Sequence, residues 1–380
     1  MSTAIVLAAG GTGGHLFPAE ALARQLVERG AEVHLLTDRR ADAFAASVPG
    51  IAVSRVRAGR LGGGPIHAAY GLAELAVGII QARRLLRRLT PGAVVGFGGY
   101  PSVPTMLAAG QLGYPTIIHE QNAVLGRANR LLAPRARRIA TGFPHTAGLR
   151  PGDETRAVQT GNPVRPAILA AATAYMPPVS DGPIELVVLG GSQGARIFSE
   201  IVPDALAALP PGLRARLRVS QQARPEDRAE VEGRYQALCI HAEIESFFAD
   251  VPARLARAQL VICRAGASTV AELAAVGRPA VLVPYLHAAD DHQTANARAF
   301  ADTGAGWVIP QPMFSAAMLA TRLAELLREP ADLSRAAQAA RGFARVDAAE
   351  RLAGLVLALV PGTNGAAVER PGERPRERAA

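Results

Sequence analysis

One short stretch near the start of the chain combines the residue types that phosphate binding and proton transfer require. Residues 10–20 read GGTGGHLFPAE, so four glycines precede His15 at the beginning of a predicted helix. Free backbone N–H groups in the first turn of a helix favour a phosphate. An imidazole beside such a site could act as a general base, and the positive helix end would keep it neutral. A lone histidine in a loop can equally be a simple hydrogen-bonding residue.

The same strand–glycine–helix pattern recurs half a chain later. IELVVLGGSQGARIFSEIVPDALAAL (residues 184–209) aligns with AIVLAAGGTGGHLFPAEALARQL at an offset of 180 residues, and His15 then faces Ala195. Neither loop has the spacing of a Walker A or GxGxxG motif, although Asp38 lies near the position of a ribose-binding acid. Two such loops predict two phosphate-bearing ligands, one per domain. The alternative is that the glycines serve only helix–strand packing.

Apolar runs that alternate with helical patterns predict an α/β fold. The runs TAIVLAAGG, AEVHLLTD, AVVGFGG, PTIIHE and RRIATGF are typical of parallel strands buried on both faces. Because the pattern restarts, we predict two Rossmann-like, doubly wound domains facing across a cleft. The expected ranges are 1–162 and 163–344. A C-terminal helix at about 345–360 would pack back on the first domain, and 361–380 would form a disordered tail.

The charge of the chain is uneven. The chain has 41 arginines and no lysine. Residues 1–162 contain 18 of these arginines and 9 acidic residues, so this half carries the whole net charge of +9. This skew indicates that the first domain meets an anionic surface or a polyanionic ligand. Cys239 and Cys263 form no CxxC pair, which favours a reducing compartment. Neither a signal peptide nor a membrane-spanning run is recognisable.

A second cluster of polar residues follows a strand of the second domain. In RAGASTVAELAAVGRPAVLVPY (264–285), Thr269 and Glu272 have the spacing of a capping box. Alternatively, Glu272 accepts hydrogen bonds from a ribose diol. Gln293 and Asn296 offer amides for sugar hydroxyls, unless they are ordinary surface residues. The stretch HEQNA lacks the second histidine of a zinc protease, and no D-x-D occurs, so we expect no metal site.

Six ordered motifs resemble the MurG-type N-acetylglucosaminyltransferases of peptidoglycan synthesis, in glycosyltransferase family 28. They are GGTGGHLFPAEALA, FGGYPSVP, HEQNAVLGRAN, TGNPVR, GGSQGAR and CRAGASTVAELAAVGRPAVLVPY with DDHQTANA. The resemblance runs from residue 1 to about 360, and one departure is His292-Gln293 in place of two adjacent glutamines.

This resemblance implies a GT-B fold and an inverting transfer without metal or cofactor. N-acetylglucosamine (GlcNAc) would move from UDP-GlcNAc to the 4-hydroxyl of the muramoyl (MurNAc) sugar in undecaprenyl-pyrophosphoryl-MurNAc-pentapeptide (lipid I), giving lipid II. Three alternatives stay open. They are a diacylglycerol-type GT-B glycosyltransferase, a UDP-GlcNAc 2-epimerase and a non-catalytic UDP-sugar-binding subunit.

The resemblance also implies roles for single residues. Ser192 and Arg165 would contact the diphosphate, the Phe248 backbone the uracil, Glu272 the ribose and Gln293 the GlcNAc. The implied set is His15 as catalytic base and, for UDP-GlcNAc, Thr12, Gly13, Gly14, Asn122, Arg165, Ser192, Phe248, Ala267, Ser268, Thr269, Val270, Ala271, Glu272 and Gln293.

A lipid acceptor implies contact with a membrane. Three apolar residues at helical spacing precede four arginines; they are Leu72, Leu75, Ile79, Arg83, Arg84, Arg87 and Arg88. An apolar face ringed by arginines would sit on an anionic leaflet. The alternative is a plain amphipathic helix packed on the sheet. We therefore expect a peripheral protein at the cytoplasmic face of the plasma membrane. Its partners would include cell-division or elongation proteins but no nucleic acid.

Overall fold

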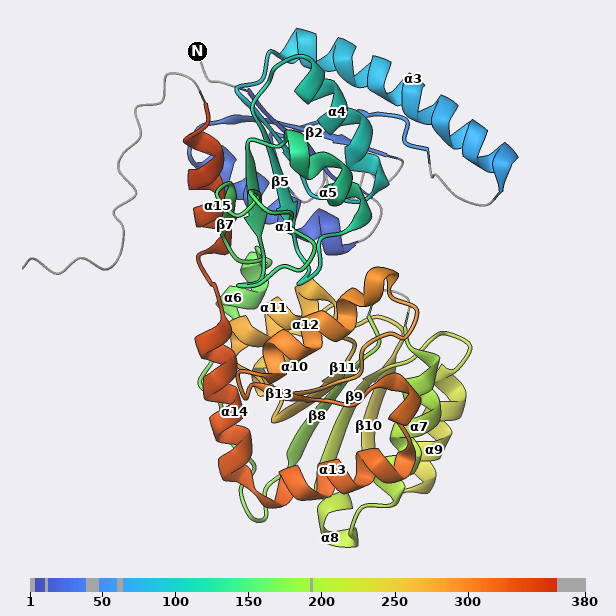
Figure 1. Cartoon of the computed structure of the whole chain (residues 1–380). Helices are drawn as coiled ribbons and strands as arrows, with labels where there is room; N and C mark the ends of the chain where they lie inside the picture. Colours follow the sequence, from blue (N-terminus) through green and yellow to red (C-terminus); the bar gives the residue numbers. More distant parts are fainter. Residues whose placement is uncertain (1–3, 11–12, 39–47, 60–63, 192–193, 361–380) are drawn as a thin grey trace, which may run out of the picture.

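The computed structural model describes residues 4–10, 13–38, 48–59, 64–191 and 194–360. These residues form two α/β lobes, each built on its own parallel sheet (Figure 1). The predicted tail at 361–380 lies outside the described residues.

The first lobe contains a parallel sheet in the order β3-β2-β1-β4-β5-β6-β7. Its strands are β1 (Ala4–Ala8), β2 (Glu32–Thr37), β3 (Ala52–Arg55), β4 (Ala93–Gly96), β5 (Thr116–Glu120), β6 (Arg138–Thr141) and β7 (Ala157–Gln159). Every residue of β1, β4 and β5 is buried, because helices cover both faces of the sheet. One face is covered by α1 (Gly13–Glu28) and α15 (Ala348–Leu357), the other by α3 (Pro65–Leu89), α4 (Val103–Gln111) and α5 (Arg127–Leu132).

The second lobe repeats this plan in the order β10-β9-β8-β11-β12-β13. Its strands are β8 (Ile184–Leu189), β9 (Leu217–Gln222), β10 (His241–Glu245), β11 (Leu260–Cys263), β12 (Ala280–Leu282) and β13 (Gly306–Val308). Its helices are α6 (Pro166–Ala170), α7 (Arg196–Ala207), α8 (Pro211–Arg214), α9 (Arg228–Ala237), α10 (Val251–Arg257), α11 (Ala267–Val276), α12 (His292–Ala301), α13 (Ala316–Arg328) and α14 (Pro330–Phe343). The predicted pair of doubly wound domains is confirmed.

Both sheets reverse their strand order beside the strand that precedes a glycine loop. β1 pairs with β2 on one side and β4 on the other, and β8 pairs with β9 and β11 in the same way. In open parallel sheets, ligands bind at this switch point, beyond the carboxyl ends of the strands. The fold therefore places both glycine loops, and the segments after β4, β5 and β11, where a ligand is expected.

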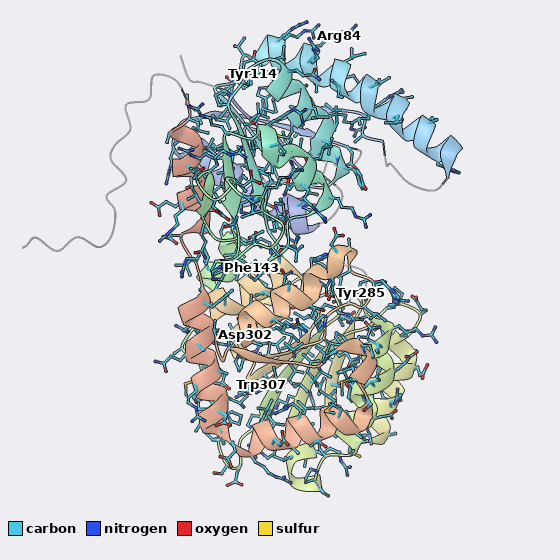
Figure 2. The ribbon with its side chains drawn as sticks, in the orientation of Figure 1. Arg84, Tyr114, Phe143, Tyr285, Asp302 and Trp307 are labelled. Atoms are coloured by element: carbon cyan, nitrogen blue, oxygen red, sulfur yellow. The ribbon has the colours of Figure 1, made fainter. Side chains whose placement is uncertain are left out.

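The chain crosses between the lobes twice. The boundary predicted at residues 162 and 163 falls between β7 and α6, and after α14 the chain returns to the first lobe as α15 (Figure 1). Leu352, Ala353 and Val356 of α15 belong to the core of the first lobe. Phe143, at the junction of the lobes in Figure 2, packs against Phe343 at the end of α14 with ring centroids 5.9 Å apart.

The long helix α3 lies at the end of the first lobe that is distant from the second lobe (Figure 1). Glycines bring it close to the strand segment beside it, since a Cβ atom on Gly78 would lie 2.0 Å from the carbonyl oxygen of Arg57. Among the described residues, no helix is long and apolar enough to cross a membrane.

Candidate active site

His15 lies in the first turn of α1, directly after the loop that follows β1. Its ring packs against Gly99, whose φ of +69° is a conformation that glycine adopts without strain. A Cβ atom at Gly99 would lie 3.2 Å from Cδ2 and 3.3 Å from Nε2 of His15. The FGGY turn after β4 therefore holds the imidazole in place and needs its glycine to do so.

The imidazole of His15 is neutral near pH 7. Burial lowers the pKa of His15, although Glu120 and the hydrogen bond with Gln121 act in the opposite direction. We predicted a neutral ring from the positive end of the helix, but the main cause is desolvation. A neutral imidazole keeps one nitrogen free to accept a proton.

A cavity of about 230 Å³ opens between the lobes beside this ring. The first lobe lines it with His15, Tyr100, Glu120 and Asn122, among others, and the second with Ala289, Asp290 and His292. Both lobes contribute polar groups, so the cavity is suited to a polar substrate that is enclosed when the lobes meet.

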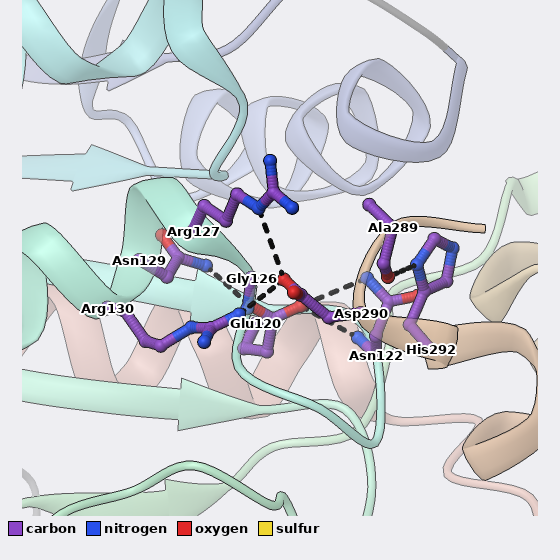
Figure 3. Close-up of polar contacts among 9 residues, drawn as sticks. All are labelled: Glu120, Asn122, Gly126, Arg127, Asn129, Arg130, Ala289, Asp290 and His292. Carbon is purple, nitrogen blue, oxygen red and sulfur yellow. Dashed lines mark hydrogen bonds and ion pairs between the residues drawn. The ribbon is translucent and has the colours of Figure 1, made fainter. Parts of the chain in front are cut away.

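A buried carboxylate organises the loop after β5 (Figure 3). Glu120, only 2% exposed, accepts hydrogen bonds at Oε1 from the backbone N–H and the side chain of Asn122, both at 3.0 Å. Its Oε2 accepts from the Gly126 N–H and from Nδ2 of Asn129, both at 2.8 Å. Four donors on one carboxylate satisfy the buried charge and fix residues 121–126. Glu120 was not predicted as a functional residue, although it is the last residue of the buried strand β5, at the carboxyl edge of the sheet.

Asn296 joins the two lobes. Its side chain is fully buried; Oδ1 accepts from the Ala123 N–H at 2.8 Å, and Nδ2 donates to Oδ1 of Asn122 and to the Ala265 carbonyl, both at 3.1 Å. The prediction that Asn296 offers an amide to a sugar is therefore wrong in this conformation, because both ends of the amide are occupied. Asn122 lines the cavity, and its orientation depends on Glu120 and Asn296.

A more exposed contact closes the same junction. Asp290 pairs with Arg130, and its Oδ2 lies 3.6 Å from Nε of Arg127 (Figure 3). Asp290 and Asp291 both have positive φ, 53° and 50°, which costs non-glycine residues strain. Exposed ion pairs contribute little stability, so this contact adds only weakly to the junction of the lobes.

Glu272 lies on α11, on the second-lobe side of the junction. The helix is capped at Gly266 and begins at Ala267, and Glu272 instead accepts hydrogen bonds from Arg165. The capping-box interpretation of Thr269 and Glu272 is therefore wrong. Burial raises the pKa of Glu272, and Arg165 counteracts this shift. A partly buried carboxylate paired with one arginine can still accept hydrogen bonds from a diol.

The other predicted nucleotide-sugar residues belong to several segments of both lobes. Ala267, Ser268, Thr269, Val270 and Ala271 form the first turns of α11, and the buried Oγ of Ser268 has no partner among the described residues. Phe248 is buried under the guanidinium of Arg254, 4.0 Å from its ring centroid. Gln293 accepts at Oε1 from the Tyr285 N–H at 2.9 Å. Gly13 and Gly14 begin α1, whereas Thr12 and Ser192 lie outside the described residues.

The apolar residues predicted for membrane contact divide between two faces of α3. Leu75 and Ile79 pack against the core of the first lobe, so they do not form an exposed face. Leu72 is 56% exposed, and Ile80 and Val77 are exposed on the same outer side. Arg84, Arg87 and Arg88 are exposed, and Figure 2 shows Arg84 at the outer end of the lobe; Arg83 is half-buried and donates to Gln111 at 3.0 Å.

Two Rossmann-like lobes with a polar cavity between them have the architecture of GT-B glycosyltransferases. The N-terminal domain of glycosyltransferase family 28 matches residues 5–141, and the C-terminal domain of that family matches residues 185–352. The chain therefore belongs to glycosyltransferase family 28.

Relatives in this family match almost the full chain. A protein of Rhodospirillum centenum is 56% identical over 95% of this chain and 96% of its own length. A protein of Paramagnetospirillum magneticum is 56% identical over 95% and 98%. Both are named UDP-N-acetylglucosamine–N-acetylmuramyl-(pentapeptide) pyrophosphoryl-undecaprenol N-acetylglucosamine transferase.

Solved structures agree with this family. The crystal structure of Acinetobacter baumannii MurG is 31% identical, with a TM-score of 0.75 over 94% of this chain and 99% of that one. A putative UDP-N-acetylglucosamine 2-epimerase of Listeria monocytogenes has a TM-score of 0.65 at 16% identity, over 94% and 96%. The second likeness shows the shared fold alone.

Proposed function

We propose that this protein transfers GlcNAc from UDP-GlcNAc to lipid I and so forms lipid II. The observation that carries the proposal is the 56% identity, over 95% of the chain, to transferases named for that reaction. Residues 1–162 would hold the acceptor and residues 163–344 the donor.

We assign the proton transfer to His15. The acceptor 4-hydroxyl forms a bond to C1 of GlcNAc while the bond from C1 to the β-phosphate breaks. The hydroxyl proton moves to the imidazole, and the bonding electron pair leaves with UDP. Attack from the face opposite the leaving group inverts the configuration at C1. The support is that the pKa of His15 is lowered by burial and that its ring borders the cavity between the lobes.

We place the UDP moiety between the second glycine loop and the start of α11. A Cβ atom on Gly190 would lie 2.4 Å from the Ala195 N, so this loop folds back tightly towards the start of α7. Helix N-termini stabilise the charge that develops on the departing diphosphate, with Arg165 and Ser192 beside it. Glu272 would accept from the ribose, the Phe248 backbone would contact the uracil and Gln293 the sugar.

We also propose that the protein binds the cytoplasmic face of the plasma membrane peripherally, through the outer face of α3. We define this outer face by Leu72, Val77, Ile80, Arg84 and Arg88. Its exposed aliphatic side chains can enter the interfacial region while its arginines meet anionic lipid. Supplying lipid II ties the enzyme to wall growth, cell shape and division, and its protein partners would belong to those processes.

The test is incubation of the protein with UDP-GlcNAc, with and without a lipid I analogue. A lipid-linked disaccharide, with UDP release that depends on the acceptor, is the expected result. Formation of UDP-ManNAc without acceptor would instead identify an epimerase. Transfer to diacylglycerol but not to the lipid I analogue would identify a different lipid glycosyltransferase. UDP binding with no turnover would identify a binding subunit.

A further inference from the structure

We infer that Gln121 is a positioning residue that holds His15 in the tautomer with its proton on Nδ1, which leaves Nε2 free as the base. The inference rests on the proposed function only for the use of that nitrogen. The tautomer itself follows from a chain of hydrogen bonds that begins at the Gly161 carbonyl and ends at His15.

The first link fixes His119. This side chain is fully buried, and its Nε2 lies 3.1 Å from the Gly161 carbonyl oxygen. A carbonyl oxygen only accepts, so Nε2 of His119 carries a proton. Burial lowers the pKa of His119 to about 4, so the ring is neutral and its Nδ1 carries a lone pair. His119 therefore presents an acceptor on the side that faces Gln121.

The second link fixes the amide of Gln121. Its Nε2 lies 2.9 Å from the Phe97 carbonyl oxygen, 3.2 Å from the His119 carbonyl oxygen and 3.1 Å from Nδ1 of His119. All three neighbours are acceptors, so only the NH₂ group fits there. The reversed amide would set its oxygen against two carbonyl oxygens and a lone pair in a buried site, which is costly. The oxygen of Gln121 must therefore point the other way.

The third link reaches the base. Oε1 of Gln121 lies 3.2 Å from Nδ1 of His15. An amide oxygen accepts, so Nδ1 of His15 must donate and carries the proton. Because the neutral ring holds one proton, Nε2 is bare, and the Gly99 turn packs against that edge of the ring. Histidine in water prefers the opposite tautomer, with its proton on Nε2, so the protein imposes the less common form.

In a serine hydrolase, a buried carboxylate holds the catalytic histidine in one tautomer and one orientation. Here the uncharged amide of Gln121 does the same for His15. A carboxylate would raise the pKa of His15, whereas the amide orients the ring without that charge. The anchor of the chain, Gly161, has φ of +86°, and a Cβ atom on it would lie 2.5 Å from Cβ of Arg345. The position of the proton on His15 therefore depends, through this chain of hydrogen bonds, on the segment where the chain crosses between the lobes.

The experiment is NMR of the full chain with ¹⁵N-labelled histidine rings, correlating each ring nitrogen with the carbon-bound protons. The signal of His15 is identified by its loss in His15→Ala. We expect a protonated Nδ1 and an unprotonated Nε2 at pH 7.5. In Gln121→Met, His15 should shift towards the Nε2–H form. The kcat should fall roughly tenfold or more, while KM for UDP-GlcNAc changes less than about twofold.

The matched control is Gln221→Met, which removes a fully buried glutamine amide of the second lobe that accepts from Tyr235. It should lower stability but leave kcat and the His15 signals unchanged. A proton on Nε2 of His15 in the wild type would overturn the inference. So would a Gln121→Met variant with unchanged kcat and tautomer. Full activity of His15→Ala would refute the proposed base instead, and would leave the tautomer result standing.

Discussion

Arg165 holds Glu272 through two hydrogen bonds to a single carboxylate oxygen, Oε1, at 3.0 Å from Nε and 2.9 Å from Nη2. The same guanidinium lies 4.8 Å from the ring centroid of Phe17, which belongs to α1 of the first lobe. Arg165 itself precedes α6, so one side chain connects the crossing segment, the first lobe and the ribose-binding candidate. The pair therefore links the proposed donor site to the arrangement of the lobes.

Replacing Arg165 by methionine should make UDP binding depend on pH. Burial already raises the pKa of Glu272, and loss of the arginine removes the main influence that lowers it. In the variant, the carboxylate of Glu272 will therefore become protonated at a higher pH than in the wild type. Once protonated, it can no longer accept hydrogen bonds from both hydroxyls of the ribose diol. Calorimetry should show roughly tenfold weaker UDP binding at pH 7, and a further loss on going to pH 5.5 that is larger than that of the wild type.

Arg228→Met is the control for this measurement, since it removes the exposed partner of Glu245. Its affinity for UDP should match that of the wild type at each pH. If Arg165→Met shows the same UDP affinity as the wild type across this pH range, the pair has no role in donor binding.

Replacing His15 by alanine should abolish turnover without abolishing donor binding. A general base contributes about 10²- to 10⁴-fold in rate, so kcat should fall by that range, while UDP affinity stays within about twofold.

The wild type should also show a pH dependence, because His15 must be unprotonated to act as the base. Because the pKa of His15 is lowered by burial, the acid limb of kcat/KM should have its midpoint below 6.5. A midpoint above 6.5, or a fully active variant, would show that His15 is structural.

The buried, neutral His119 should make the folded protein lose stability in mild acid. Its pKa is about 4 in the folded chain against about 6.5 unfolded, so between these values the unfolded state binds the extra proton. The stability that depends on neutral His119 is present above pH 6.5 and is lost as pH falls towards 4. From pH 7 to 4.5 this loss is about 2 kcal/mol.

Urea unfolding of the wild type and of His119→Gln at both pH values measures this effect. Glutamine can still donate to the Gly161 carbonyl but does not titrate. The variant should lose about 2 kcal/mol less than the wild type on acidification. Equal losses would mean that His119 is not buried as a neutral ring.

The outer face of α3 should carry membrane affinity. The double variant Leu72→Glu/Ile80→Glu puts two carboxylates on that face and should no longer pellet with vesicles that contain anionic lipid. Arg84→Ala/Arg88→Ala should weaken binding and reduce its dependence on salt. Met318→Glu, an exposed apolar residue of α13 in the second lobe, should bind like the wild type. If the double variant pellets normally, α3 is not the contact.

The sequence predicts the fold well because the glycine loops after residues 8 and 189 repeat with the same strand and helix around them. A duplicated local pattern needs no knowledge of long-range contacts. The contrast between His15 and Ala195 is equally local, and the structure places His15 at the cavity between the lobes.

The sequence-based predictions are wrong where the orientation or the hydrogen-bond partner of a side chain depends on a residue distant in the sequence. Leu75 and Ile79 share helical spacing with Leu72, but only packing on the sheet decides which of them face inwards. Thr269 and Glu272 fit a capping box, yet the helix begins earlier and Arg165, over a hundred positions away, takes the carboxylate. Glu120 and Asn296 meet through Asn122 only because the two lobes are placed side by side.

The most direct test of the central claim is mass analysis of the lipid product formed from UDP-GlcNAc and a lipid I analogue by the wild type and by His15→Ala. The account predicts that the wild type adds one N-acetylhexosamine to the lipid-linked muramoyl sugar, with inversion at C1. His15→Ala should form it at a small fraction of that rate. An unmodified acceptor after incubation with the wild type would contradict the assignment.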